Sequence, residues 1–273
     1  MWIVLIVILI LLLLWILALT PRVKDRPDFS PLKNHDYAHR GYYLKDQSIP
    51  ENSLPGFFRA VQNNFGVELD VHLTKDGRLA VLHDENLNRM CGVDLNLSEL
   101  TADQLKDYCL MGTKEHIPLF TDVLQVIDGK IPMVIEVKPY GGNIGSLCQQ
   151  LCVELEGYTG VYCMESFDPR AVYWFRKHRP EIVRGQLAMN WKQYGEQANP
   201  VVAWIAGNLL TSFLTKPDFI AYHLEDRKNL SFRLSKLFYK IQEFSWTIHT
   251  PADADEVKKT GGLIIFEYFD PRK

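Results

Sequence analysis

The feature that most constrains the fold is a regular alternation of short apolar segments with helix-like segments along most of the chain. Each apolar segment is rich in Val, Ile, Leu or Phe and has a length typical of a buried strand. Neighbouring parallel strands need a long crossover connection, usually a helix, so this alternation predicts a parallel α/β architecture. Eight strands are expected, at residues 36–41, 67–73, 133–138, 161–166, 182–187, 219–223, 245–250 and 263–266.

Helices are expected between these strands. Ser53 is suited to be the N-cap of the first of them, with Pro55 in its first turn. The chain has 273 residues, which fits one (β/α)₈ barrel of about 250 residues and leaves little for a second domain. The other helices are expected at residues 119–127, 144–155, 169–178, 201–214, 230–242 and 252–260.

One region interrupts the alternation. Residues 79–83 are expected to form a short return strand after the turn at residues 75–78, and this strand would carry His83. Residues 85–116 fit no strand–helix unit, although residues 95–105 have a partly helical pattern. We therefore expect a barrel over residues 37–273 with a small insertion at 85–116, after the second strand.

The N-terminal run Trp2–Leu19 is uninterrupted and apolar, and about 18 or more apolar residues are typical of a membrane span. No Lys or Arg precedes Arg22 and the run is long, which favours an uncleaved single-pass anchor at residues 1–20 over a cleaved signal peptide. Residues 21–36 contain three prolines and are expected to be a linker. Basic residues only on the C-terminal side of the run predict a cytoplasmic barrel, with export as the alternative. These basic residues are Arg22, Lys24, Arg26 and Lys33.

Composition excludes some classes of protein. The net charge of −3 gives no reason to expect a nucleic-acid partner. The five cysteines lack metal-type spacing and are expected to be reduced thiols, in agreement with a reducing compartment. The sequence does not indicate an oligomeric state.

Three carboxylates lie within predicted strands. Glu68 and Asp70 are two residues apart, so both face the same side of the strand 67–73. Two adjacent carboxylates repel each other, so a strand that holds both usually holds a cation between them. Glu136 could complete the site, and Lys138 on the same face suits an anionic ligand such as phosphate. Oxygen ligands favour Mg²⁺ or Ca²⁺, with Mn²⁺ as a further candidate.

These residues belong to an ordered set of short motifs. The set comprises HRG, PENS, ELDV, TKDG, LHD and IEVK, followed by ESFDP at residues 165–169, WTI at 246–248 and IIFE at 264–267. In this order they resemble the glycerophosphodiester phosphodiesterase family, and the resemblance covers residues 37–267. Two positions depart from it, because the seventh strand ends in His249, where much of the family has Asn, and the last strand ends in Glu267, where an Asp-containing motif is common. These departures affect the expected alcohol specificity and not the metal centre.

The resemblance implies a TIM barrel, a divalent metal and metal-dependent hydrolysis of a glycerophosphodiester to sn-glycerol 3-phosphate and an alcohol. It implies acid–base roles for His39 and His83, without deciding which is the base, and phosphate contacts for Arg40 and Lys138. The nucleophile it implies is the neighbouring 2-hydroxyl of glycerol, through a cyclic phosphate that water opens. Glu51 and Trp246 are further candidates for substrate contact, Glu51 also for metal contact.

Each assignment has a structural alternative. Glu51 and Asn52 could only cap the next helix, Trp246 could be core packing, and His72 is expected in the core or at the rim. Residues 201–214 could touch a membrane, although their polar residues favour a packed helix. A phospholipase D acting on lysophospholipids or sphingolipids at the membrane is the alternative within the same chemistry. A non-catalytic receptor or scaffold on a degenerate barrel is the alternative outside it.

Overall fold

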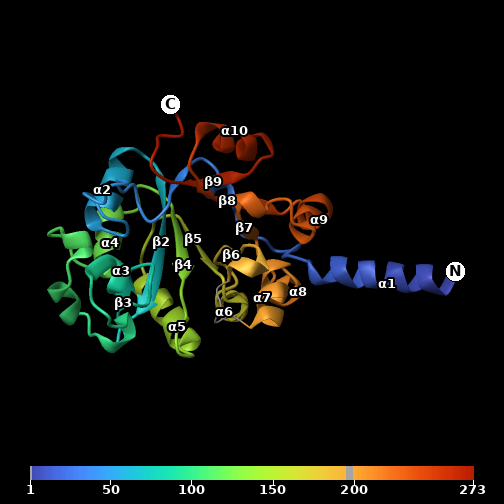
Figure 1. The fold of residues 1–273 in the computed structure, drawn as a ribbon, viewed down its shortest axis with the longest axis horizontal. Helices are drawn as coiled ribbons and strands as arrows, with labels where there is room; N and C mark the ends of the chain where they lie inside the picture. Colours follow the sequence, from blue (N-terminus) through green and yellow to red (C-terminus); the bar gives the residue numbers. More distant parts are fainter. Residues whose placement is uncertain (1, 195–198) are drawn as a thin grey trace.

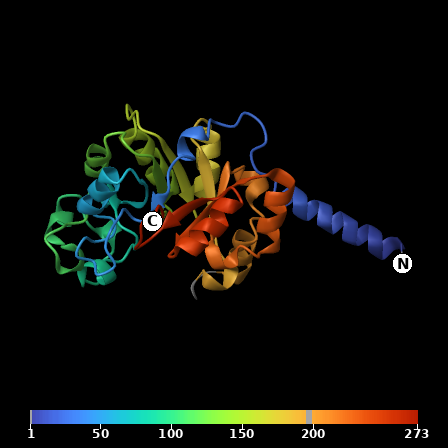
Figure 2. The same cartoon turned by 90° about the horizontal axis from the view of Figure 1, so that it is seen from above.

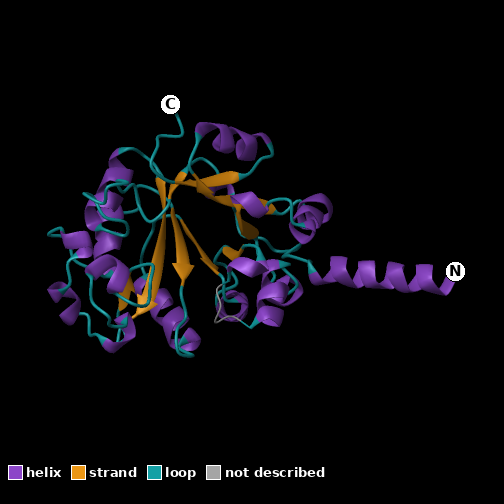
Figure 3. Cartoon of the chain, in the orientation of Figure 1, coloured by secondary structure: helices purple, strands orange, loops and turns teal. Residues whose placement is uncertain are grey.

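The computed structural model describes residues 2–194 and 199–273, and its centre is a closed barrel of eight parallel strands surrounded by helices (Figures 1 and 3). The sheet order is β1-β9-β8-β7-β6-β5-β4-β2, and pairing of β1 with both β2 and β9 closes the barrel. The predicted TIM barrel is therefore confirmed. Its parallel strands are β1 (Tyr37–Ala38), β2 (Gly66–Leu73), β4 (Met133–Val137), β5 (Tyr162–Ser166), β6 (Arg184–Ala188), β7 (Phe219–His223), β8 (Gln242–Ile248) and β9 (Leu263–Phe266).

Helices follow the strands as expected. Ser53 is the N-cap of the first, since its Oγ accepts a hydrogen bond from the backbone N–H of Gly56 (3.3 Å). The α-helices around the barrel are α2 (Leu54–Gln62), α4 (Phe120–Ile127), α5 (Ile144–Glu154), α6 (Pro169–His178), α7 (Pro200–Gly207), α8 (Ser212–Thr215), α9 (Leu230–Tyr239) and α10 (Pro251–Lys259). Short 3₁₀ turns lie at Ser30–Leu32, Leu97–Glu99, Gln104–Asp107, Leu110–Gly112, Trp191–Gln193 and Leu224–Asp226.

Side chains alternate between two apolar layers. Inward-facing residues such as Tyr37, Phe219 and Phe244 fill the barrel, whereas outward-facing residues such as Leu69 and Ile135 pack against the helices. Tyr37 and Phe244 meet edge to face, with ring centroids 5.2 Å apart. The barrel interior is thus a packed core.

The predicted single helix over residues 201–214 is wrong in detail. It is divided into α7 and α8, and Leu209 between them has a left-handed backbone conformation (φ 58°). Gly207 ends α7 where a Cβ atom would lie 2.7 Å from the carbonyl oxygen of Met189. The turn places the carbonyl of Gly207 where it accepts a hydrogen bond from the hydroxyl of Tyr222 (2.8 Å).

The region after β2 has a small core of its own. β3 (Leu79–Val81) pairs antiparallel with β2, and α3 (Asn88–Cys91) follows it. Leu82, Met90 and Leu97 belong to an apolar cluster in this region. From α3, Arg89 reaches the carboxylate of Glu51 beside the barrel (2.7 Å).

The helix α1 (Trp2–Ala18) projects away from the barrel (Figures 1 and 2). None of its residues is buried, and only its C-terminal end is docked, where Trp15 donates a hydrogen bond to Ser231 (2.9 Å) and packs on Trp204. Within residues 2–194 and 199–273, no helix has both the length and the apolar character needed to cross a membrane. The predicted transmembrane anchor is therefore not supported by the structure, because α1 is only 17 residues long.

Candidate active site

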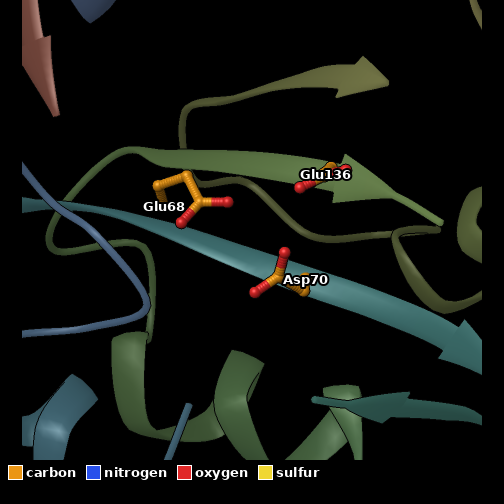
Figure 4. Close-up of side chains that lie close together, drawn as sticks. All are labelled: Glu68, Asp70 and Glu136. Atoms are coloured by element: carbon orange, nitrogen blue, oxygen red, sulfur yellow. The ribbon is translucent and has the colours of Figure 1, made fainter. Parts of the chain in front are cut away.

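The three carboxylates predicted from the sequence come together at the carboxyl end of the barrel. Glu68 and Asp70 project from β2 and Glu136 from β4, where Asp70 and Glu136 are partners in the strand register (Figure 4). One oxygen of each lies within 4.8 Å of the other two, and all three residues are buried. Hard oxygen donors at this spacing suit a divalent cation.

Two strained loop residues hold this group in place. Arg40 and Asn52 both have left-handed backbone conformations (φ 52°), which are uncommon for residues other than glycine. The backbone N–H of Arg40 donates to Glu68 Oε2 (3.0 Å), and Asn52 Nδ2 donates to Asp70 Oδ2 (2.8 Å). Asn52 therefore both precedes the helix cap and orients a carboxylate of the site.

Two cations partly neutralise the carboxylates. Lys138 Nζ lies 2.9 Å from Glu136 Oε2 and 3.2 Å from Asp70 Oδ1, and Arg40 Nε lies 3.7 Å from Asp70 Oδ2. Burial would raise the pKa of Asp70, but Lys138, followed by His83 and Arg40, holds it well below its ordinary value. Burial raises the pKa of Glu136 to about 7 even though Lys138 opposes the shift. The group still has more carboxylates than cations, which favours binding of a further cation.

His39 is held by a carboxylate from the opposite end of the chain. Its Nδ1 lies 2.5 Å from Glu267 Oε1, and the other oxygen of Glu267 lies 3.0 Å from Nε2 of His249. Burial would raise the pKa of Glu267, but hydrogen bonds, first that from His39, outweigh burial and hold it well below its ordinary value. The ionised carboxylate fixes the His39 ring with Nε2 toward the site, 3.8 Å from Glu68 Oε2.

His83 has a similar arrangement. Its Nδ1 lies 2.6 Å from Asp84 Oδ1, and Arg89 donates to the other oxygen of Asp84 (2.5 Å). Burial, followed by the charge of Lys138, lowers the pKa of His83 to about 4 against the opposing effect of Asp70. His83 is therefore neutral at neutral pH and can accept a proton.

Of the remaining predicted residues, Trp246 lines a small pocket beside the carboxylates, and Glu51 and His72 do not line it. Glu51 is bound by Arg40 (2.8 Å) and by both terminal nitrogens of Arg89, so its predicted contact with substrate or metal stays a prediction. His72 lies off the site, since its Nε2 is 3.2 Å from the backbone carbonyl of His83, which agrees with its expected core or rim position. The pocket is lined by His39, Arg40, Glu68, His83, Glu136, Glu165, Phe167, Leu187, Trp246 and Ile265.

Sequence reasoning missed two site residues. Glu165 pairs with Glu136 in the register of β4 and β5, is buried, and its Oε2 has no hydrogen-bond partner among the described residues. Burial raises its pKa well above the ordinary value. Glu267 was noticed only as a departure from the family motif, and its contact with His39 joins residues 228 positions apart. The signal for Glu165 was its place in the ESFDP motif at the end of a strand.

These residues fit a divalent metal on structural grounds. Glu165 Oε2 is a buried oxygen without a hydrogen-bond partner in the described chain, and Asp70 Oδ1 has only the ion pair with Lys138 at 3.2 Å; both belong to the carboxylate-lined end of the barrel. Unsatisfied buried acceptors are costly, and a cation would satisfy them.

Comparison with known proteins identifies relatives. A model of the Glycerophosphoryl diester phosphodiesterase family matches residues 39–262. The glycerophosphodiester phosphodiesterase of Bacillus altitudinis is 35% identical over 113 residues, which are 37% of this chain and 43% of that protein. The enzyme of the same name from Caldanaerobacter subterraneus subsp. tengcongensis is 37% identical over 109 residues, 37% of this chain and 44% of that protein. The chain thus matches less than half the length of these relatives.

Solved structures share the fold. A phosphodiesterase of Oleispira antarctica, solved in complex with the product sn-glycerol-3-phosphate, superposes with a TM-score of 0.72 at 20% identity, covering 88% of this chain and 95% of that one. A glycerophosphodiester phosphodiesterase of Thermotoga maritima superposes with a TM-score of 0.66 at 21% identity, covering 86% and 95%.

Proposed function

This chain belongs to the glycerophosphoryl diester phosphodiesterase family, and from that premise we propose that it hydrolyses glycerophosphodiesters to sn-glycerol 3-phosphate and an alcohol. The observation that carries the proposal is the pair of histidines at one pocket. Each is oriented through Nδ1 by its own carboxylate, and both lie beside the three clustered carboxylates. An acid and a base at one anion-binding pocket suit phosphodiester cleavage.

Glu68, Asp70 and Glu136 would hold one divalent ion, with Mg²⁺ or Ca²⁺ preferred because all three donors are carboxylate oxygens. Such an ion supplies Lewis-acid stabilisation of charge on the phosphoryl oxygens when it is bound. Lys138 and Arg40 lie at the same carboxylates and would bind the non-bridging oxygens of the phosphate. Their charges favour the more negative transition state over the substrate.

We assign the base to His83 and the acid to His39. His83 is neutral at neutral pH and has an orienting carboxylate, so it can take the proton of the attacking hydroxyl. Glu267 orients His39 through Nδ1, so its Nε2 can donate a proton to the leaving alkoxide as the phosphorus–oxygen bond breaks. Attack by the 2-hydroxyl of glycerol leaves a cyclic phosphate, which water then opens to sn-glycerol 3-phosphate. Trp246, Phe167 and Leu187 form the apolar wall against which the alcohol would lie.

Phosphorus NMR of the reaction products tests the proposal. The full chain is incubated with glycerophosphocholine and Mg²⁺, Ca²⁺ or Mn²⁺, with EDTA as the metal-free control. We expect the diester resonance to be replaced by that of sn-glycerol 3-phosphate, and EDTA to abolish the change. An intact diester under every metal condition would reject the proposal and favour a non-catalytic barrel.

A phospholipase D activity on lysophospholipids is the second candidate. It is favoured by the apolar wall of the pocket and by the exposed apolar side chains of α1. A human protein named lysophospholipase D GDPD1 is 34% identical over 101 residues, which are 32% of each chain. Faster turnover of lysophosphatidylcholine than of glycerophosphocholine would select this candidate.

We also propose that α1 places the chain at a membrane, with the barrel on the cytoplasmic side. Thirteen large apolar side chains from Trp2 to Leu14 are exposed, at 46–77% of their surface. A helix that is apolar on all sides normally contacts an apolar environment. The basic residues that follow it favour the cytoplasmic side.

A further inference from the structure

A cavity of about 420 Å³ at the base of α1 is lined mainly by cations. It is distinct from the candidate active site, because Arg184 begins β6 and Asp218 directly precedes β7, so both lie at the amino end of the barrel. Five cationic side chains line the cavity, whereas the carboxylates at or beside it are those of Asp25 and Asp218. The cavity is thus locally positive although the whole chain has a net charge of −3. The cations are Arg22, Lys24, Arg176, Arg184 and Lys216.

Arg184 is the group that most needs a partner. Its side chain is 3% exposed, its Nε donates to the carbonyl of Thr215 (3.3 Å), and its Nη1 has no hydrogen-bond partner among the described residues. The nearest carboxylate oxygen, on Asp218, is 3.9 Å from Nη1, beyond hydrogen-bond length. A buried guanidinium donor without an acceptor is costly. An anion in the cavity would supply the acceptor.

Arg176 and Lys216 are positioned by backbone carbonyls. Arg22, in contrast, shares the carboxylate of Asp218 with Arg184. Arg176 donates to the carbonyl of Leu214, and Lys216 Nζ lies 3.4 Å from the carbonyl of Thr20. Arg22 donates to the carbonyl of Pro180 (2.7 Å) and lies 3.8 Å from Asp218. These bonds gather positive charge from the linker, α6, β6 and the segment after α8. Burial lowers the pKa of Arg184 to about 10. Asp218 opposes this shift, and the charges of Arg22 and Arg176 add to it.

We propose that this cavity binds a phosphate group, and that its source is the head group of an anionic phospholipid. Guanidinium groups match phosphate oxygens in geometry as well as charge. The lipid source follows from the position of the cavity, since Lys216 contacts the residue that joins α1 to the linker. Acyl chains could therefore lie along the exposed apolar surface of α1 while the phosphate contacts Arg184. Basic pockets beside membrane helices are a known mode of head-group binding.

Calorimetric titration of the full chain in a neutral detergent tests the site. The probes are dihexanoyl phosphatidylglycerol and inorganic phosphate, with EDTA present to keep the candidate active site metal-free. We expect saturable binding of the lipid. Lys24→Ser and Lys216→Gln should each weaken it about tenfold, the loss expected for one charge-assisted hydrogen bond. Lys75→Ser, which removes an exposed lysine from the turn after β2, is the matched control and should bind like the wild type.

The outcomes separate the two sources of phosphate. If only the lipid binds saturably, and both variants bind it more weakly, the phosphate source is the lipid head group. Equal saturation by inorganic phosphate supports the site but assigns it to a free anion, and overturns the lipid source. Binding by neither probe, or binding unchanged in both variants, overturns the proposal. Arg184→Met is the most direct variant, and its thermal unfolding midpoint must first match that of the wild type. Since the readout is binding and not turnover, the result does not depend on the proposed catalysis.

Discussion

At the scale of single residues, the candidate site depends on two histidine–carboxylate pairs. Glu267 contacts Nδ1 of His39, and Asp84 contacts Nδ1 of His83. Such a partner selects the tautomer and the orientation of the ring, so the opposite nitrogen remains available for proton transfer. The two pairs differ in exposure, since the His39 side chain is 13% exposed and that of His83 is 32% exposed.

The first prediction concerns these histidines. His39→Ala and His83→Ala should each lower kcat by roughly 10²–10⁴, the usual share of general acid–base catalysis. His178→Ala is a matched control, because His178 lies at the exposed end of α6. Steady-state turnover of glycerophosphocholine gives the measurement, and circular dichroism checks the fold. Near wild-type turnover in either variant would remove that histidine from the mechanism.

The second prediction is the titration of His83. Its pKa of about 4 in the fold lies below the ordinary 6.5, so the unfolded chain binds a proton that the folded chain does not. His83 thus destabilises the fold progressively as the pH falls from 6.5 to 4, and has no such effect above 6.5. The pKa of Glu136 is raised to about 7, so its effect on stability has the opposite sign. The contribution of His83 is therefore measured by comparing the wild type with a variant changed at His83 alone.

NMR titration of the imidazole in the metal-free chain should give a midpoint near pH 4. Urea unfolding should show that His83→Gln loses less stability than the wild type between pH 6.5 and 4. A midpoint near 6.5 would show that burial and Lys138 do not lower the pKa of His83.

At the scale of elements, the site depends on the register between strands. Asp70 on β2, Glu136 on β4 and Glu165 on β5 are successive partners across the sheet, so their side chains form one row. A shift of one residue in any of these strands would turn its carboxylate into the apolar layer beneath the helices. The candidate metal site thus depends on strand pairing rather than on one loop.

The third prediction tests Glu136, which belongs both to this row and to the candidate metal site with Glu68 and Asp70. Glu136→Gln should weaken binding of Mg²⁺ or Ca²⁺ and lower activity together, because a neutral amide is a poorer ligand for a hard cation. Calorimetric titration of the metal measures the affinity. Glu154→Gln, which changes a carboxylate on α5 outside the site, serves as the control. Unchanged metal affinity in Glu136→Gln would refute the three-carboxylate site.

At the scale of the whole molecule, the chain places two charged sites at opposite ends of one barrel. The carboxyl end holds the histidines and carboxylates, and the amino end holds the cationic cavity beside α1. The helix leaves the barrel between α7 and α9, where Leu19 is buried and Thr20 contacts the hydroxyl of Tyr239 (3.0 Å). Under the proposed membrane contact of α1, the orientation of this helix would determine which compartment the candidate active site faces.

The fourth prediction is this orientation. A reporter fused after Lys273 should be active only in the cytoplasm, because basic residues follow α1 closely. Substituting Arg22, Lys24 and Arg26 together by serine should weaken this preference. Activity of an extracytoplasmic reporter, or removal of the barrel by protease added to intact cells, would reverse the assignment and make external phosphodiesters the substrates.

Local pattern in the sequence determined much of this protein. Strand and helix periodicity located all eight barrel strands, and the two-residue spacing of Glu68 and Asp70 put them on one face. Short-range chemistry also placed the Ser53 cap. The local pattern did not predict the turn that divides residues 201–214. At Gly207 a Cβ atom would collide with the carbonyl oxygen of Met189, which lies outside that segment.

Tertiary structure decided the rest. Closure of the barrel brings β1 beside β9, and only this contact gives His39 its carboxylate at Glu267. The burial of Glu165 beside Glu136, and the assembly of Arg22 with Arg184, likewise depend on strand order and helix docking. Periodicity in a sequence reports which face a side chain occupies, because that depends on neighbours a few residues away. It does not report which distant side chain meets it across a closed sheet.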